Sequence, residues 1–386
     1  MNVFYFNYSH DLSLANGRKN YVPPLHVRQM ETDLMPLAAM VAAQGDVVVV
    51  DERRMEVVPS FYKRSCPQVS FVSFANLPGG SSLQPWGWNA NVVWKLGRHG
   101  YDSMLPAEFL SNVRFLSSRR WAVDVLRDLR DEMGDLPLCG EPQFCDTEEA
   151  AAAAIKNLPS SIVKAPLSGS GRGLRFGQGV WQPPLSGWCQ RVIREQGGVV
   201  VEPLYCRARD FAAEFVASSD GEVHYVGLSL FHTTDRCSYL GNVVAHQEAL
   251  MEETFRDFNA KVYMEVASWL ERKLTQWLSG RYVGPLGIDM MLCCQDGKLL
   301  LHPCVEINLR CTMGHVALAL SSRIAVGKKA LFSLRYEKAT QDLYNYCAQS
   351  PQAEFDASGR LTAGLMQLTP LHPEAHYVAL FETIIE

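Results

Sequence analysis

The stretch IVKAPLSGSGRG at residues 162–173 decides which fold we expect of this chain. An apolar run ends in Lys164, and glycines follow at positions 169, 171 and 173. Backbone N–H groups of such a loop can converge on phosphate oxygens, and a lysine at the end of a strand adds a point charge. No Gly-Lys-Ser/Thr follows, as in a P-loop, and no helix opens at the third glycine, as in a dinucleotide-binding fingerprint. The stretch favours a phosphate site of another kind, with a flexible hairpin loop as the alternative.

A second informative segment is VVVEPL at residues 199–204, which predicts a buried strand that ends at Glu202. Main-chain groups exposed at the end of such a strand can pair with adenine, and a carboxylate can accept a hydrogen bond from its amino group. The alternative is a glutamate that caps the strand in solvent. The segment alone favours this alternative.

Two further segments, GIDMML at residues 287–292 and VEINLR at residues 305–310, predict antiparallel strands joined by a turn at 296–297. Residues i and i+2 share one face of a strand, so Glu306 and Asn308 lie on the same side. Antiparallel pairing brings Asp289 close to that end of the partner strand. Three oxygen-bearing side chains suit Mg²⁺ better than a soft metal, and carboxylates within apolar strands need a compensating charge. The pattern predicts a metal site, with an acidic surface edge as the alternative.

The flanking sequence alternates strands and helices. Strands expected at 3–6 and 46–50 enclose a helix at 35–43, which indicates a βαβ unit with a parallel sheet. The polar segment 7–24 is expected to be a loop, and we place a domain boundary near Gly134. The other expected elements are a strand at 69–74, helices at 92–96, 119–129 and 147–156, a hairpin of 211–218 with 223–231, one helix at 248–278, a helix at 336–347 and a hairpin within 360–381.

Composition is that of a globular chain with two or three domains, because 47% of its 386 residues are hydrophobic and 20% are charged. The formal net charge is −5 without a run of Lys and Arg, so neither nucleic acid nor an anionic membrane is an expected partner. The first ten residues lack the zones of a signal peptide, and no apolar stretch is long enough to span a bilayer. The 11 cysteines form no CxxC pair, so we expect reduced thiols and a cytoplasmic location.

The order of these segments resembles the ATP-grasp superfamily: a strand with a lysine and a glycine loop, a strand with a terminal glutamate, an acidic strand, and then E-x-N-x-R. The match runs over residues 134–314, and the unit before it resembles the pre-ATP-grasp domain. Many members carry a lysine in the helix before the lid, where this chain has Arg119 and Arg120. The resemblance implies an α/β fold with a parallel-sheet pre-ATP-grasp domain at 1–133, a lid subdomain at 134–205, a metal-binding subdomain at 206–325 and an extension at 326–386.

The resemblance also implies ATP and Mg²⁺ as cofactors and gives each part of the pattern a role. The nucleotide residues implied are Lys164 for the phosphates, Ser168, Gly169, Ser170, Gly171 and Gly173 for the lid, Glu202, Pro203 and Leu204 for adenine, and Asp210 for ribose. The metal ligands implied are Asp289, Glu306 and Asn308, and Arg310 would stabilise the transferred phosphoryl group.

Several polar residues outside the motif are further candidates. Arg236 lies in a polar loop at 231–239 that follows the hairpin, and as a phosphate-binding cation over the site it is a candidate catalytic residue beside Arg310. His10 and Asp11 follow the first strand, where ligands gather in open sheets, although such pairs also cap turns. His302 and His315 flank the E-x-N-x-R strand as partners of site residues or as ordinary core histidines.

We therefore expect an ATP-dependent ligase that converts a small-molecule or peptide carboxylate into an acyl phosphate for attack by an amine or similar nucleophile. The glycine lid would exclude water from this intermediate. A kinase on the same scaffold and a nucleotide-binding module without turnover are the alternatives. A module of that kind would lack a metal ligand, whereas all three are present in this sequence.

Overall fold

The N-terminal part of the chain is an α/β unit with a parallel sheet. The computed structural model describes residues 1–101, 105–169, 173–235 and 237–384. The first sheet consists of β1 (Asn2–Tyr5), β2 (Val47–Val49), β3 (Ser70–Val72) and β4 (Ser82–Pro85), paired in parallel in the order β3-β2-β1-β4. Its helices are α1 (His10–Asn16), α2 (Leu25–Leu34), η1 (Met35–Met40), η2 (Glu52–Arg54), α3 (Val57–Tyr62), η3 (Phe74–Asn76), α4 (Ala90–Arg98) and α5 (Phe109–Leu116).

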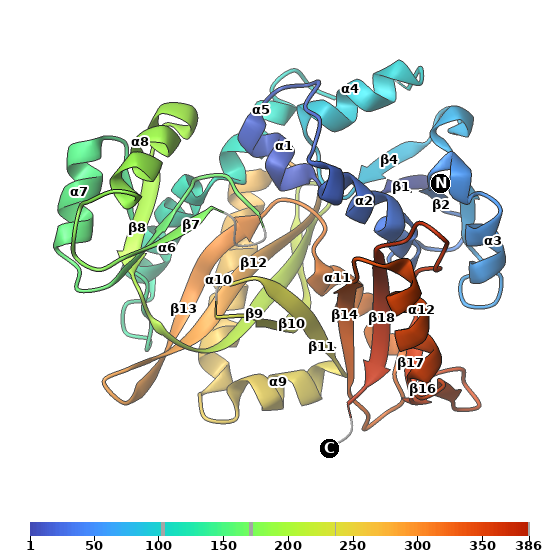
Figure 1. The fold of residues 1–386 in the computed structure, drawn as a ribbon. Coiled ribbons are helices and arrows are strands. Elements are labelled where there is room, and N and C mark those ends of the chain that lie inside the picture. The colour runs from blue at the N-terminus through green and yellow to red at the C-terminus, as the bar shows by residue number, and fades with distance from the viewer. Residues whose placement is uncertain (102–104, 170–172, 236, 385–386) are drawn as a thin grey trace.

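A small antiparallel sheet with two helices forms a lobe of its own, at the left of Figure 1. It consists of β5 (Gln143–Cys145), β6 (Ser161–Lys164), β7 (Leu174–Gly177) and β8 (Val199–Pro203), in the order β5-β8-β6-β7, with α7 (Glu148–Lys156) and α8 (Leu185–Gln196). Apolar side chains such as Val163, Val201 and Ile155 form a separate core there. Because this core is independent of the others, the lobe is built as a distinct packing unit.

An eight-stranded sheet forms the centre of the molecule (Figure 1). Its strands are β9 (Cys206–Ala217), β10 (Val223–Thr233), β11 (Tyr239–Val244), β12 (Gly284–Gln295), β13 (Lys298–Asn308), β14 (Ala330–Tyr336), β17 (Leu365–Gln367) and β18 (Tyr377–Thr383), in the order β13-β12-β9-β10-β11-β14-β18-β17. The helices α6 (Arg119–Glu132), α9 (Gln247–Phe255) and α10 (Ala260–Leu278) share the largest apolar core with this sheet.

The C-terminal tail extends the central sheet and joins it to the N-terminal unit. β14 pairs with β11, and β18 pairs with β14 and β17. A second apolar core combines N-terminal residues such as Val48 with tail residues such as Phe332 and Phe381. The remaining elements are α11 (Met313–Leu320), η4 (Ser321–Arg323), α12 (Thr340–Gln349), β15 (Glu354–Phe355) and β16 (Leu361–Ala363).

The architecture confirms the expected fold class, a parallel-sheet unit followed by a two-lobed α/β structure. Four local predictions were wrong. The segment 7–24 contains helix α1, and the helix expected at 35–43 is the short 3₁₀ helix η1 preceded by α2. The helix expected at 248–278 is two helices, and the tail contains the strand β14 before a helix that begins later than expected. Domain limits at 133, 205 and 325 stay a prediction. No helix in the described ranges is long and apolar enough to cross a membrane.

Candidate functional site

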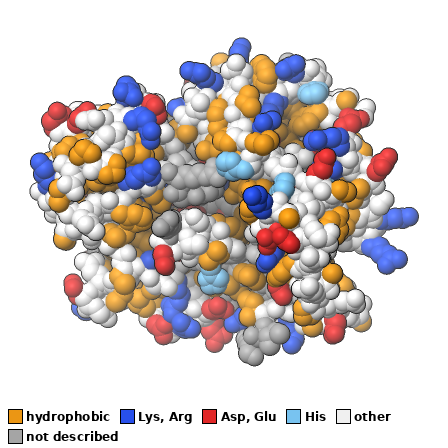
Figure 2. All heavy atoms as spheres, in the orientation of Figure 1, with side chains coloured by type: hydrophobic (Ala, Val, Ile, Leu, Met, Phe, Trp, Pro, Cys, Tyr) orange, Lys and Arg blue, Asp and Glu red, His pale blue; other side chains and the backbone are white. Residues whose placement is uncertain are grey.

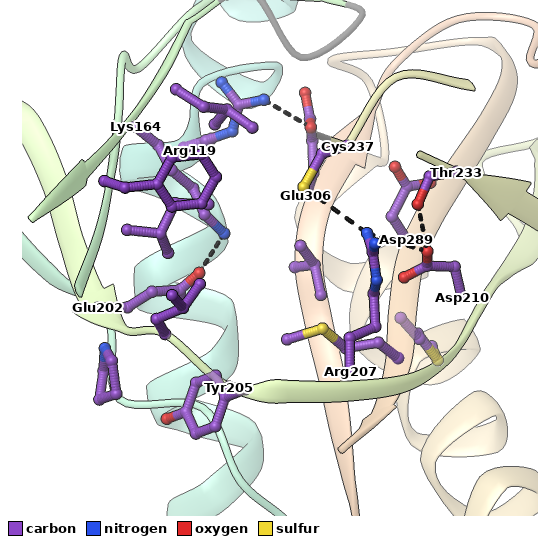
Figure 3. Close-up of a pocket in the computed structure, with 18 of the residues that line it drawn as sticks. Arg119, Lys164, Glu202, Tyr205, Arg207, Asp210, Thr233, Cys237, Asp289 and Glu306 are labelled. Atoms are coloured by element: carbon purple, nitrogen blue, oxygen red, sulfur yellow. Dashed lines mark hydrogen bonds and ion pairs between the residues drawn. The ribbon is translucent and has the colours of Figure 1, made fainter. Parts of the chain in front are cut away.

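Two cavities meet where the small lobe faces the central sheet. The first, of about 250 Å³, is lined by Lys164 and Glu202 of the lobe and by Asp210, Asp289 and Glu306 of the central sheet. Figure 3 shows these side chains pointing toward one another from the two sides of this cavity. The second cavity, of about 170 Å³, also has Asp289 and Glu306 in its wall. In Figure 2 this side of the molecule is hollowed between the lobe and the rest of the chain. The residues predicted to bind phosphate, adenine and metal therefore line one continuous site.

Lys164 and Glu202 form a buried ion pair that the sequence did not predict. The ammonium of Lys164, at the end of β6, contacts the carboxylate of Glu202 on the neighbouring β8 (Figure 3). His302 Nε2 lies 3.4 Å from the other carboxylate oxygen. Burial is the largest influence on Glu202 and would raise its pKa, but Lys164 and His302 together lower that pKa to about 2. Any phosphate at Lys164 must therefore compete with an ionised Glu202.

Arg119 joins three parts of the site. One guanidinium nitrogen donates to Ala165 O and to Ser168 Oγ, both at 2.7 Å. The other donates to Glu306 Oε2 at 2.6 Å. Only 6% of the residue is exposed, so this cation is held between helix α6, the start of the glycine loop and strand β13. Sequence reasoning did not include Arg119 among the site residues; the only signal was an arginine where the resemblance implies a lysine.

The three predicted metal ligands lie together as the strand alternation required. Asp289 of β12 is directly paired with Glu306 of β13, and Asn308 follows two residues later. Burial, then the charges of Glu306 and Glu214, raise the pKa of Asp289 well above its ordinary value. Within the described ranges, no three His, Cys, Asp or Glu side chains gather as a metal site. The three predicted ligands are thus two carboxylates and one amide. Arg119 forms an ion pair with the Glu306 carboxylate.

Arg310 reaches the site together with a carboxylate from the N-terminal unit. Its Nε and one Nη donate to the two oxygens of Asp11 at 2.9 and 3.0 Å, and that Nη also donates to Asn308 Oδ1 at 2.9 Å. Burial would raise the pKa of Asp11, but Arg310, with His10 and Arg119, lowers it. His10 itself is buried 3.1 Å from Asn89 Nδ2 and lines neither of the two cavities. Of the two candidates His10 and Asp11, only Asp11 lines the site.

Asp210 and the strand end after Glu202 border the first cavity. Asp210 accepts from Thr233 Oγ1 at 2.6 Å and lies 3.2 Å from an Arg207 nitrogen; burial raises its pKa. Pro203 has no N–H group, and the N–H of Leu204 donates to Ser160 O at 3.2 Å. The adenine and ribose roles of these residues stay predictions, and the amide of Leu204 is engaged within the protein.

The described part of the glycine loop touches the N-terminal unit. A Cβ atom at Gly169 would lie 2.6 Å from Asp11 Oδ2, so a side chain there would displace the Asp11–Arg310 pair. At Gly173 a Cβ would overlap the side chain of Ser168. Three predicted site residues, Ser170, Gly171 and Arg236, lie outside the described residues.

The second cavity has a mixed polar and aromatic wall. Asp11, Trp86 and Tyr8 line it from the N-terminal unit, opposite Glu214 and Tyr239 of the central sheet. Arg310 and Asn308 also line the second cavity, together with Asp289 and Glu306. The sequence did not point to Glu214, because one glutamate within a hairpin strand carries no signal of its own.

Comparisons with known proteins identify the fold. No protein-family model and no curated protein sequence matches the chain. The structure is similar to biotin carboxylase of Campylobacter jejuni in a β-γ-ATP complex, with 13% identity, a TM-score of 0.52, and coverage of 99% of this chain and 87% of that one. N5-carboxyaminoimidazole synthetase of Staphylococcus aureus with ADP is 12% identical, with a TM-score of 0.50 and coverage of 100% and 93%.

A third similar structure is the biotin carboxylase domain of the 2-oxoglutarate carboxylase of Hydrogenobacter thermophilus, in complex with MgADP, ADP and bicarbonate. It is 11% identical, with a TM-score of 0.50 and coverage of 99% of this chain and 86% of that one. At these identities the likeness establishes architecture rather than activity. The chain has the ATP-grasp fold.

Proposed function

We propose that the protein is a Mg²⁺- and ATP-dependent ligase that activates a carboxylate as an acyl phosphate for attack by an amine or similar nucleophile. The observation that carries this proposal is the meeting of two cavities at Asp289 and Glu306. One cavity provides room for a nucleotide and the other for a second reactant, with the acidic pair and Arg310 at their junction. The similar structures contain ATP- or ADP-type ligands, and one also contains bicarbonate.

The first cavity has the chemistry to hold a nucleotide. Lys164 and Arg119 provide two cations for phosphate oxygens, and both are now paired with carboxylates. Apolar groups such as Ile162, Met290 and Leu174 line the same cavity and suit a flat base. Nucleotide binding would exchange the internal ion pairs of Lys164 and Arg119 for pairs with phosphate. Glu202 and Asp210 would then be free to accept from the adenine amino group and the ribose hydroxyls.

The acidic pair fits a Mg²⁺ ion. Burial, and then the charges of Glu306 and Glu214, raise the pKa of Asp289, so a divalent cation would favour its ionised form. Mg²⁺ is commonly held by one or two carboxylates with substrate phosphates completing its shell, which matches two carboxylates and Asn308. Bound there, Mg²⁺ would neutralise charge on the transferring phosphoryl group.

Arg310 would stabilise phosphoryl transfer. Asp11 and Asn308 hold its guanidinium in a fixed orientation at the junction, and a preorganised cation stabilises developing charge without reorganisation. Water has to be kept from an acyl phosphate. The lid that would exclude it is the glycine loop, as predicted from the sequence.

The first test is binding of Mg-ATP, read from melting and calorimetry. At about a hundred times its dissociation constant, Mg-ATP should stabilise the protein by roughly 2.7 kcal/mol. Lys164→Met should weaken this binding on the order of tenfold to a hundredfold, whereas Lys156→Met, on the exposed face of α7, should not. Because Lys164→Met leaves Glu202 buried without its ammonium, the double variant Lys164→Met/Glu202→Gln is measured in parallel.

The outcomes separate the possible activities. A wild-type protein that neither melts higher with Mg-ATP nor with Mg-ADP would overturn the proposal. ADP formation that requires both a carboxylate and a nucleophile identifies a ligase, whereas ADP formation with one hydroxyl acceptor identifies a kinase. Binding without ADP formation under any such pairing would leave only a nucleotide-binding role.

A further inference from the structure

Glu214 is a buried carboxylate at the inner wall of the second cavity. Only 1% of the residue is exposed, yet it lines the cavity from strand β9. Its Oε1 accepts from Ser229 Oγ at 2.8 Å. Its Oε2 is buried and has no hydrogen-bond donor among the residues that the structure describes. A carboxylate oxygen in that position is costly unless a donor or a cation reaches it.

The neighbouring His315 does not supply that donor. Its Nδ1 lies 3.1 Å from Glu214 Oε2, which would be an ion pair if this nitrogen carried a proton. However, Nδ1 accepts from the Thr312 N–H at 3.3 Å, while Nε2 lies 3.1 Å from Phe215 O, an acceptor that requires the proton on Nε2. Nδ1 is thus already engaged by Thr312, and Glu214 Oε2 has no hydrogen-bond partner among the described residues. The short distance is therefore a contact and not a hydrogen bond.

Two glycines make room for this carboxylate. A Cβ atom at Gly314 would overlap Glu214 Oε1. A Cβ atom at Gly287 would lie 2.5 Å from Glu214 Oε2, which is too close for a non-bonded contact. Gly314 opens helix α11 and Gly287 lies in strand β12, so backbone from two elements encloses the group. This enclosure distinguishes Glu214 from a stray surface glutamate.

Among the described residues that line the second cavity, no cation is paired with Glu214. Its described lining contains four carboxylates, those of Asp11, Glu214, Asp289 and Glu306, and one guanidinium, that of Arg310. Arg310 is already paired with both oxygens of Asp11. Asp289 and Glu306 form the wall shared with the first cavity, visible in Figure 3, and are the proposed metal ligands.

We propose that Glu214 binds a positively charged nitrogen of the substrate, a primary ammonium group, within the second cavity. This inference rests on the proposed ligase function and adds which chemical group the second cavity selects. The same wall contains Trp86 and Tyr239, residues of the aromatic type that attracts cations. The ammonium belongs either to the carboxylate substrate, which would then be an amino acid, or to a separate amine.

The test compares small charged probes on the wild type and on Glu214→Gln, which keeps the shape and an acceptor for Ser229. Ethylammonium, propionate and alanine are titrated into protein with and without saturating Mg-ADP, at constant ionic strength, and melting and calorimetry are recorded. Ethylammonium should stabilise the wild type, and its affinity should fall about thirtyfold or more in Glu214→Gln. Propionate affinity should not fall. Glu222→Gln, an exposed residue of the β9–β10 turn, is the matched control.

The arms distinguish both the source of the ammonium and the cause of a failure. Alanine binding that exceeds the sum of ethylammonium and propionate indicates one amino-acid substrate, and additive binding indicates two separate molecules. Ethylammonium affinity that is equal in wild type and Glu214→Gln overturns the anchor, whatever Mg-ADP does. No response to Mg-ADP overturns the ligase function, while the titrations without nucleotide still report on Glu214. If Glu214→Gln does not fold, Glu214→Met gives the same comparison.

Discussion

At the scale of single residues, Asp289 shows a conflict between stability and the proposed metal site. Burial and the nearby Glu306 and Glu214 raise its pKa in the fold. A carboxyl group whose folded pKa exceeds its unfolded value lowers stability when it is ionised. The free energy of unfolding should therefore fall as pH rises from the ordinary value of 3.8 through the raised folded pKa of Asp289.

We predict that Asp289→Asn stabilises the metal-free protein at pH 7, by about 1 kcal/mol, as substitutions that relieve a functional site commonly do. The same change should reduce Mg²⁺-dependent turnover on the order of a hundredfold. Urea unfolding at pH 7 and pH 4 measures the first effect, and the gain should shrink at pH 4, because the free-energy cost of the raised pKa disappears as the pH falls toward the ordinary value of 3.8. Asp220→Asn, on an exposed turn, controls for a general loss of charge. An Asn variant that is less stable than wild type at pH 7 would refute the argument.

The residues that were predictable from sequence are those linked by a local period. Glu306 and Asn308 share a strand face, and Asp289 meets them through a hairpin whose register the turn at 296–297 sets. The ion pairs that complete the site were not predictable, because Arg119 lies 187 residues from Glu306 and Asp11 lies 299 residues from Arg310. No periodicity connects positions so far apart.

At the scale of elements, the long helix expected at 248–278 breaks where a capping residue allows it. α9 ends at Phe255, and α10 begins after Asn259, whose side chain accepts from the N–H of Lys261. Apolar residues continue at helical spacing through the break, so a prediction from periodicity alone treats the two helices as one. For the polar segment 7–24 the error was the opposite, because a helix was missed. Helix α1 has only seven residues, too few to show a helical period, and it is followed by Gly17 in a left-handed conformation with φ of 74°.

We predict that Asn259→Ala destabilises the protein by about 1 kcal/mol, because the N–H group of Lys261 in the first turn of α10 loses its side-chain acceptor. Chemical denaturation gives the free energy of unfolding. Gln276→Ala, an exposed position on the same helix, should be near neutral. Equal losses in the two variants would mean that the cap adds nothing beyond helix propensity.

At the scale of the whole molecule, three parts of the chain build one site. The lobe gives Lys164 and Glu202, the central sheet gives the acidic pair, and the N-terminal unit gives Asp11. The tail secures the N-terminal unit, because Asp33 of α2 accepts from His372 Nε2 and from the N–H of His376 at 2.9 Å each. The sequence did not predict this role of the tail, because strands that extend a sheet far away in the sequence have the same pattern as those of a local hairpin.

The Asp11–Arg310 ion pair connects the N-terminal unit to the candidate site. It joins the N-terminal unit to the E-x-N-x-R strand end, and Gly169 of the lobe packs against the same carboxylate. Asp11 touches Arg310 and borders the second cavity, so in the proposed reaction it would position the guanidinium. Its pKa is lowered in the fold, so its ionised form contributes stability that is present above the unfolded pKa and lost as pH falls through the folded value.

We predict that Asp11→Asn reduces turnover about tenfold or more, as loss of a partner that orients a functional group commonly does, while Mg-ATP affinity changes little. The amide keeps one acceptor but loses the charge and one of two parallel bonds, so Arg310 should sample other orientations. Steady-state ADP formation gives kcat, and calorimetry gives nucleotide affinity. Asp51→Asn, whose partner Arg53 is exposed in the same N-terminal unit, should leave both unchanged. The acid limb of the pH–stability curve should also flatten in Asp11→Asn, because the lowered pKa of Asp11 no longer contributes to stability. If kcat is unaffected while that limb flattens, Asp11 serves the fold alone, and the N-terminal unit does not position Arg310 for catalysis.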